Sequence, residues 1–62
     1  MKFGDLPIGA VFFENSTGEY CLKVSCTMST VYDFSKKDVF TYNSGHTVDF
    51  EFPPDLDVEL LE

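Results

Sequence analysis

The residues with the greatest chemical potential are the acids near the C-terminal end of the sequence. Residues 49–62 carry six carboxylates and no base, a balance of −6, whereas residues 1–48 carry five acids and four lysines, a balance of −1. Two carboxylates at a suitable separation can hydrolyse a glycosidic bond, and carboxylate clusters bind calcium or magnesium. The spacing of Asp55, Asp57 and Glu59 lacks the glycine and the terminal glutamate of a calcium loop. We therefore expect neither a catalytic pair nor a metal site there.

Cys21, Cys26 and His46 are the other side chains that could bind a metal or act as a nucleophile. A structural zinc site has four ligands, so a Cys-x4-Cys spacing with one distant histidine is incomplete. A catalytic cysteine–histidine pair would need a cleft and an oxyanion hole, and no motif indicates either. We predict that the chain is not an enzyme, holds no cofactor or metal, and uses its cysteines as small core residues.

The acids instead favour a charged surface. If residues 47–52 and 55–60 are strands, alternate acids project from one face of each, about 6.6 Å apart. This spacing is about twice the ~3.4 Å rise per phosphate on one DNA strand, so a row of carboxylates would fit a groove built for nucleic acid. The same acids would also keep the strands soluble and discourage edge pairing, and both interpretations remain open. The acids concerned are Asp49, Glu51, Asp55, Asp57 and Glu59.

The elements that must position these residues have the pattern of β-strands. Turn residues recur at short, regular intervals, and no stretch of about ten residues shows helical periodicity. The predicted strands cover residues 10–13, 19–25, 31–34, 39–42 and 47–52. Residues 27–30 either form an exposed loop or extend the strand over 19–25. That strand alternates, with Tyr20, Leu22 and Val24 on one face and Cys21, Lys23 and Ser25 on the other, which is the period of a half-buried strand.

The segment 47–52 alternates most clearly and ends at Pro53 and Pro54, which cannot donate a ladder hydrogen bond. Its inward-facing residues should be Val48, Phe50 and Phe52. For the following segment, 55–60, we prefer a short strand, because its apolar residues share a face only at period 2. The alternative is a helical turn that begins at Pro54, with acids at its positive end.

The composition predicts one small β domain over residues 1–62. Seven phenylalanines and 44% hydrophobic residues are enough for one compact core in a chain of 62 residues. The fold that we expect is all-β, with a five- or six-stranded antiparallel sheet curled into a small SH3-like or open barrel and little helix.

The net charge of −7 and the lack of arginine argue against direct nucleic-acid binding, because phosphate recognition needs a basic surface. No apolar run approaches the ~20 residues that span a bilayer, and anionic lipid would repel so acidic a chain. Two cysteines without an apolar leader favour an intracellular protein with reduced thiols. We expect a soluble, cytoplasmic protein.

Aromatic residues are the expected anchors for a partner. Phe12 and Phe13 are consecutive, so they lie on opposite faces of one predicted strand, and one of them must be exposed or covered by a loop. An exposed phenylalanine beside Tyr20, Tyr32 or Tyr42 would be a binding hot spot. We select Phe12 and Tyr42 as candidate contacts, together with the acids named above.

Residues 3–12, which begin Phe-Gly-Asp-Leu-Pro-Ile-Gly, and the later segment 20–25 resemble a class of short bacteriophage and prophage proteins of uncharacterised role. The likeness covers residues 3–25 and is structural, with Leu6 and Ile8 expected to fill the core. Small acidic phage proteins are often inhibitors of host machinery, including anti-CRISPR proteins. The resemblance therefore implies a counter-defence role in the host cytoplasm.

These features favour an interaction protein that inhibits a host protein complex, such as a nucleic-acid-binding one, through the acidic face of residues 49–62. The alternative is a structural or accessory phage module that self-associates or aids assembly. A homodimer is compatible with either hypothesis.

Overall fold

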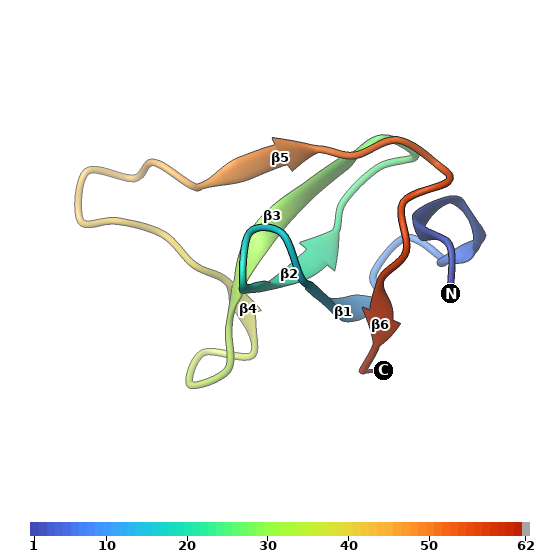
Figure 1. The fold of residues 1–62 in the computed structure, drawn as a ribbon. Coiled ribbons are helices and arrows are strands. Elements are labelled where there is room, and N and C mark those ends of the chain that lie inside the picture. Colours follow the sequence, from blue (N-terminus) through green and yellow to red (C-terminus); the bar gives the residue numbers. More distant parts are fainter. Residues whose placement is uncertain (62) are drawn as a thin grey trace.

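The computed structural model describes residues 1–61, which are built almost entirely from antiparallel strands (Figure 1). In this part of the chain a one-turn 3-10 helix precedes six strands. The elements are η1 (Phe3–Asp5), β1 (Val11–Glu14), β2 (Glu19–Lys23), β3 (Met28–Asp33), β4 (Asp38–Val39), β5 (Asp49–Glu51) and β6 (Glu59–Leu60). The predicted all-β class and antiparallel sheet are confirmed.

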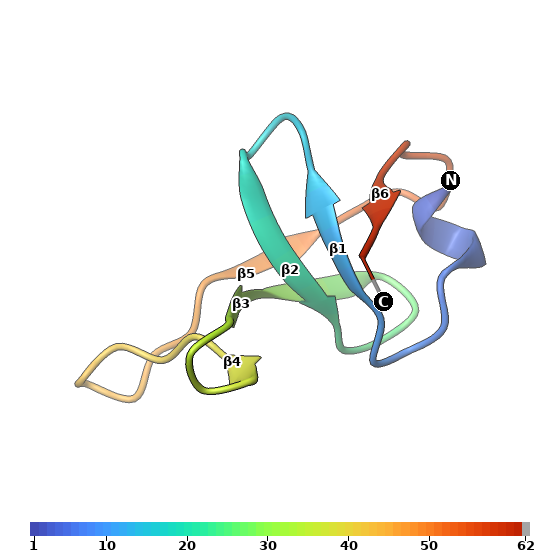
Figure 2. The same cartoon turned by 90° about the horizontal axis from the view of Figure 1, so that it is seen from below.

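The strands follow the order β4-β3-β2-β1-β6, and β5 also pairs with β3. β2 takes one edge of β3, while the other edge is shared by β5, along Met28–Thr30, and by β4, along Tyr32 and Asp33. Figure 2 shows β6 beside β1 on one side of the molecule. Across residues 1–61 the sheet is not closed into a barrel.

The observed strands differ from the predicted ranges, and two of them differ most. The strand expected over residues 31–34 already begins at Met28, because residues 28–30 pair with β5 and residues 29–31 pair with β2. The strand expected over 39–42 stops at Val39. Phe40 and Val48 still form backbone hydrogen bonds with Val31, and residues 41–47 between them form a projecting loop (Figures 1 and 2). The tip of this loop is held by backbone hydrogen bonds of Tyr42 with Gly45 and His46.

The segment 55–60 is not helical, but only its last two residues, Glu59 and Leu60, form a strand, so the predicted strand is shorter than expected. The Leu56 carbonyl oxygen accepts a hydrogen bond from the Phe3 amide at 2.8 Å, and the Val58 amide donates to the Met1 carbonyl oxygen at 2.8 Å. Glu59 and Leu60 then pair with β1 as β6. This segment therefore holds the first residues of the chain against the sheet.

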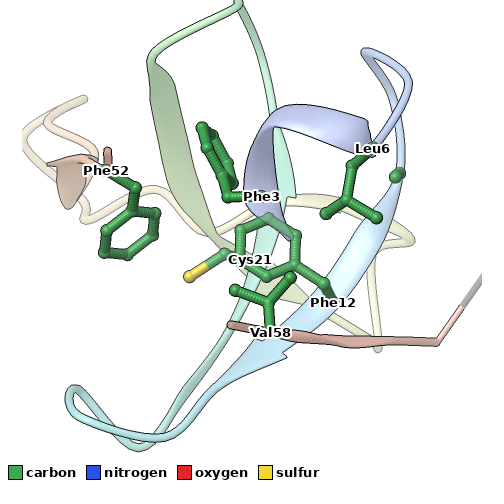
Figure 3. Packing of buried hydrophobic residues seen from close by; sticks show 7 residues of the cluster. Phe3, Leu6, Phe12, Cys21, Phe52 and Val58 are labelled. Carbon is green, nitrogen blue, oxygen red and sulfur yellow. The ribbon is translucent and has the colours of Figure 1, made fainter. Parts of the chain in front are cut away.

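The hydrophobic core lies on one face of β1 and β2, under η1 and residues 52–58 (Figure 3). The rings of Phe3, Phe12 and Phe52 meet edge to face, with centroids 5.5 to 6.1 Å apart. Full burial of a phenylalanine side chain is worth about 3 kcal/mol, so these three rings supply much of the driving force for folding. The complete cluster is Phe3, Leu6, Ala10, Phe12, Cys21, Phe52 and Val58.

The buried face of β2 is the opposite of the one that its apolar residues suggested. Cys21 and Lys23 are buried, whereas Tyr20 is 41% exposed. The cause is the pairing register: Phe12 lies directly opposite Cys21, and residues opposite each other in antiparallel strands share a face. The expectation that Ile8 fills the core is also wrong, since its side chain is 63% exposed.

Lys23 enters the core without disrupting it, because its ammonium finds backbone acceptors there. The Nζ atom donates to the carbonyl oxygens of Phe3, at 2.9 Å, and Leu6, at 2.7 Å. It also lies 4.5 Å from the centre of the Phe3 ring. The Phe3 oxygen, at the start of η1, also accepts the Leu6 amide, whereas the Leu6 oxygen lies just after the end of η1, where carbonyls lack helical partners. Lys23 therefore holds η1 against β2.

Candidate binding surface

The face of the sheet opposite to the core, hereafter the outer face, follows from the strand register. Residues opposite each other across an antiparallel pair share a face, as do residues two apart on one strand. Phe13 lies opposite both Tyr20 and Glu59, and Thr30 lies opposite both Leu22 and Asp49. The outer face therefore consists of Val11, Phe13, Tyr20, Leu22, Met28, Thr30, Tyr32, Val39, Asp49, Glu51 and Glu59.

Four rings on and beside the outer face form a contact chain, hereafter the aromatic cluster: Phe13, Tyr20, Tyr32 and Phe34. The centroids of Phe13 and Tyr20 are 4.9 Å apart. Phe34 stands edge to face against Tyr20 at 5.1 Å and against Tyr32 at 5.0 Å. Tyr20 and Phe34 are 41% and 51% exposed, and the other two are half-buried. A connected, solvent-exposed set of large rings is typical of an interaction site.

Carboxylates lie at both flanks of the outer face. Glu59, on β6, is directly opposite Phe13, and it is exposed. On the other flank Glu51 is opposite Met28 and is exposed as well. Asp49 is partly engaged, because its Oδ1 atom accepts hydrogen bonds from the hydroxyls of Thr30 and Thr47, each at 2.8 Å.

The predicted acids therefore do not make one continuous row on neighbouring strands. Three strands separate β5 from β6 in the pairing order. Asp55 and Asp57 lie in the exposed connection between them, and Asp57 is 3.5 Å from the Nζ atom of Lys2. The same lysine donates to the Asp55 carbonyl oxygen at 3.2 Å. What the fold brings together is carboxylate and aromatic side chains on one face.

The two aromatic residues that we selected as contacts have different positions. Phe12 is fully buried in the core, so it is not available to a partner, and its neighbour Phe13 belongs to the aromatic cluster instead. Tyr42 is 53% exposed, but it lies in the projecting loop, where its ring contacts Phe40. The alternation in the sequence identified the pair 12 and 13 and left open which member faces outward. Phe34 was missed because it follows the end of β3, in a turn.

The cysteines and the histidine lie apart. Cys21 is buried, as predicted, and burial together with the nearby charges of Glu19 and Glu14 raises the pKa of its thiol to about 12. Cys26 is exposed, so its assignment to the core is wrong. His46 is exposed in the projecting loop and shares a hydrogen bond of 2.8 Å with Ser44. Within residues 1–61 no three metal-binding side chains converge, and no pocket is present.

Two further acids stabilise turns. Glu14 is 1% exposed, and although burial alone would raise its pKa, hydrogen bonds from Ser16 and Thr17 outweigh this effect and hold the pKa below its ordinary value of 4.5. The pKa of Asp33 is lowered mainly by the hydroxyl of Ser35, which donates to its Oδ1 atom at 2.7 Å. Both carboxylates therefore have a structural role at the ends of hairpins.

Comparison with protein-family models, with curated proteins and with solved structures gave no match to this chain. No helix in residues 1–61 is long and apolar enough to cross a membrane. The candidate site is therefore defined by its own geometry, an aromatic surface flanked by carboxylates.

Proposed function

We propose that the chain is a non-catalytic binding protein whose outer face contacts a positively charged protein. The observation that carries this proposal is the aromatic cluster, which is exposed on the same face as Glu51 and Glu59. Aromatic side chains provide most of the affinity in many interfaces, since each ring removes a large apolar area from water. The cluster would be the energetic centre of the contact.

The charge of the chain supports a basic partner. A net charge of −7 attracts a positively charged surface over a distance of about one Debye length, and this attraction raises the association rate and selects the partner. Most of the negative charge belongs to residues 49–62, whose acids include Glu51 and Glu59 on the outer face. Electrostatic attraction and aromatic contact would therefore act through one face.

Inhibition of a host complex, the role implied by the resemblance of residues 3–25, is one form of this function. The chain would cover a basic surface of the host complex and prevent its use. In a nucleic-acid-binding host protein, the carboxylates on the two flanks of the outer face would meet the sites that normally hold phosphates. The rings of the aromatic cluster, on the same face, would contact the apolar part of that surface.

Self-association, as in a structural or accessory phage module, is the second candidate. The observation that favours it is the pair Leu60 and Leu61, which are 44% and 51% exposed at the edge strand β6. Repulsion between two chains of charge −7 opposes it. Size-exclusion chromatography with light scattering distinguishes the two, because a dimer that persists on dilution supports self-association and a monomer supports the binding protein.

The binding proposal is tested by affinity capture from a bacterial host lysate at low and high salt. Replacing Tyr20 and Phe34 together by serine should abolish capture, and Glu51→Gln with Glu59→Gln should weaken it and reduce its salt dependence. Matched controls are Tyr42→Ser, an exposed ring outside the cluster, and Asp5→Asn, an exposed acid outside the outer face. Unchanged capture by the Tyr20 and Phe34 variant would refute the proposal.

A further inference from the structure

We infer that the free edge of β5 is a second binding site, where an extended protein segment joins the sheet as an antiparallel strand. The segment would carry two basic residues that flank an apolar one. This site goes beyond the proposed function, because it uses the sheet edge at Asp49 and Glu51 and does not need the aromatic cluster. Three properties of β5 support it: its unpaired backbone groups, its exposed carboxylates and its half-buried ring.

The backbone of β5 has hydrogen-bonding groups that the sheet does not use. Among residues 1–61 β5 pairs with β3 alone, and Figure 1 shows it along the margin of the molecule. The Val48 carbonyl oxygen and the Phe52 amide both bond toward β3, at 3.0 and 2.9 Å. Backbone groups of successive residues in a strand point to opposite edges, so those of Asp49 and Glu51 point away from β3. The free edge therefore offers two donors and two acceptors to an added strand.

The charges at this edge determine which strand would fit. Asp49 and Glu51 are two residues apart, so both project from the outer face, and both are exposed. Within residues 1–61 the one ion pair joins Lys2 to Asp57, so neither carboxylate of β5 is paired with a base. Opposite charges directly across an antiparallel pair stabilise it. Lysine or arginine opposite these two acids would therefore favour addition of the strand.

The same charges disfavour a second copy of this chain as the added strand. In a symmetric antiparallel pairing of two β5 strands centred on Phe50, Asp49 of each copy would lie opposite Glu51 of the other. Like charges directly opposite each other are destabilising. Lysine and proline are the residues that most often protect a sheet edge, whereas β5 carries carboxylates there. The edge is therefore closed to acidic strands and open to basic ones.

The residue between the two acids adds an apolar contact. Phe50 packs against the core cluster, where its ring stacks on Phe52 with the centroids 5.6 Å apart. Its side chain is half-buried, since no strand lies beyond β5 within residues 1–61. An apolar residue opposite Phe50 would remove more of this ring from water and extend the core. The segment that fits therefore alternates as basic, apolar, basic.

The test uses a capped synthetic peptide of about nine residues, with threonine-arginine-valine-arginine-threonine at its centre and glycine and serine at each end. Binding is followed by ¹⁵N-edited NMR and hydrogen exchange of the full chain at low salt. In the free chain the Asp49 and Glu51 amides should exchange rapidly, and the Phe50 amide, which faces β3, should be protected. Saturating peptide should slow exchange of the first two at least about tenfold.

Modified peptides separate the backbone contact from the charge. N-methylation of both arginines removes the donors that would face β5 and should abolish binding. N-methylation of the valine, the matched control, alters the opposite edge of the peptide and should change binding less than about twofold. Moving the arginines to adjacent positions keeps the charge but puts them on opposite faces, so binding should weaken about fivefold.

Variants of the chain then localise the site. Glu51→Lys should weaken binding of the arginine peptide about tenfold and allow a peptide with glutamate in place of arginine to bind. Glu59→Lys makes the same charge change on the opposite flank of the outer face and should weaken binding less than about threefold. The variant with serine at both Tyr20 and Phe34 should bind the arginine peptide unchanged, because the aromatic cluster is not part of this edge.

Equal binding of the peptide that is methylated at its arginines would overturn the inference. Unchanged exchange of the Asp49 and Glu51 amides, or no binding of the arginine peptide, would do so as well. These results leave the proposed function intact, because that function fails only if the Tyr20 and Phe34 serine variant retains capture from the lysate. The two proposals can therefore fail separately.

Discussion

Lys23 offers the sharpest test of how this small fold is held together. Replacing it with methionine keeps a long side chain but removes the ammonium that donates to the Phe3 and Leu6 carbonyl oxygens. The Phe3 oxygen retains a hydrogen bond from the Leu6 amide, at 3.1 Å, whereas the Leu6 oxygen loses its hydrogen bond from the Lys23 ammonium. One buried carbonyl without a partner costs about 1–3 kcal/mol.

Two other effects of the Lys23→Met substitution oppose each other. The contact of the ammonium with the Phe3 ring is lost, which costs up to about 2 kcal/mol. The desolvation of a buried charge is no longer required, which returns a comparable or larger amount. We therefore expect a net loss of at most about 1–3 kcal/mol, the cost of the Leu6 carbonyl. Lys23→Ala also removes the packed methylenes and should cost about 3–5 kcal/mol.

These losses are large for a domain of this size. At about 0.05–0.15 kcal/mol per residue, 62 residues give a total stability of about 3–9 kcal/mol, so the alanine variant should be partly unfolded. Urea denaturation followed by far-UV circular dichroism measures the change. The matched control is Lys36→Met, an exposed lysine in the turn after β3, which should change stability by less than about 0.5 kcal/mol.

Hydrogen exchange adds a local readout for Lys23→Met. The Leu6 amide, which donates to the Phe3 carbonyl oxygen, should exchange faster in the variant, because η1 is held less firmly. A methionine variant as stable as the parent chain, with unchanged exchange at Leu6, would refute this explanation of the buried lysine. It would mean that the hydrogen bonds of the ammonium only offset its own desolvation.

Three further predictions concern single contacts. Glu14→Gln should lower the free energy of unfolding by about 1–2 kcal/mol at neutral pH. Because the folded pKa of Glu14 lies below its ordinary value of 4.5, the carboxylate's contribution to stability is complete above that value and is lost as the pH falls through the folded pKa. Urea titrations of the variant and the parent chain should therefore converge in acid. In thiol titration of the native protein only Cys26 should react rapidly. Cys21 should react only in denaturant, since the pKa of its thiol is raised to about 12. Rapid reaction of both cysteines would contradict the burial of Cys21. Gly4→Ala should destabilise the fold by about 1–3 kcal/mol, because the added Cβ atom would lie 2.9 Å from the Cβ atom and 3.0 Å from the carbonyl oxygen of Pro54. An unchanged urea midpoint would show that the chain relieves this close contact at no cost in stability.

Local patterns in the sequence were sufficient for the fold class and for several elements. The turn at residues 15–18 and the alternation after it located the β1–β2 hairpin, because strand period and turn chemistry depend on neighbouring residues only. The alternation of 47–52 likewise placed Phe52 in the core, with Asp49 and Glu51 exposed. The concentration of negative charge in residues 49–62 is a property of the sequence itself.

The choice of face required the tertiary structure. Alternation shows that β2 has two faces, but only its register with β1, in which Phe12 meets Cys21, determines that Lys23 is buried and Tyr20 is exposed. The acceptors that make a buried lysine tolerable lie 17 and 20 residues away in the chain, so no local pattern could identify them.

The candidate surface divides in the same way. The sequence by itself determined which side chains could contact a partner, the acids of residues 49–62 and a group of aromatic residues. Only the tertiary structure decided that β5 and β6 lie on opposite flanks, with Phe13 and Tyr20 on strands between them, Phe34 just beyond the end of β3, and Phe12 in the core. The reason is physical: composition and period are local properties, whereas strand order and register depend on which distant segments pair and which polar groups they satisfy.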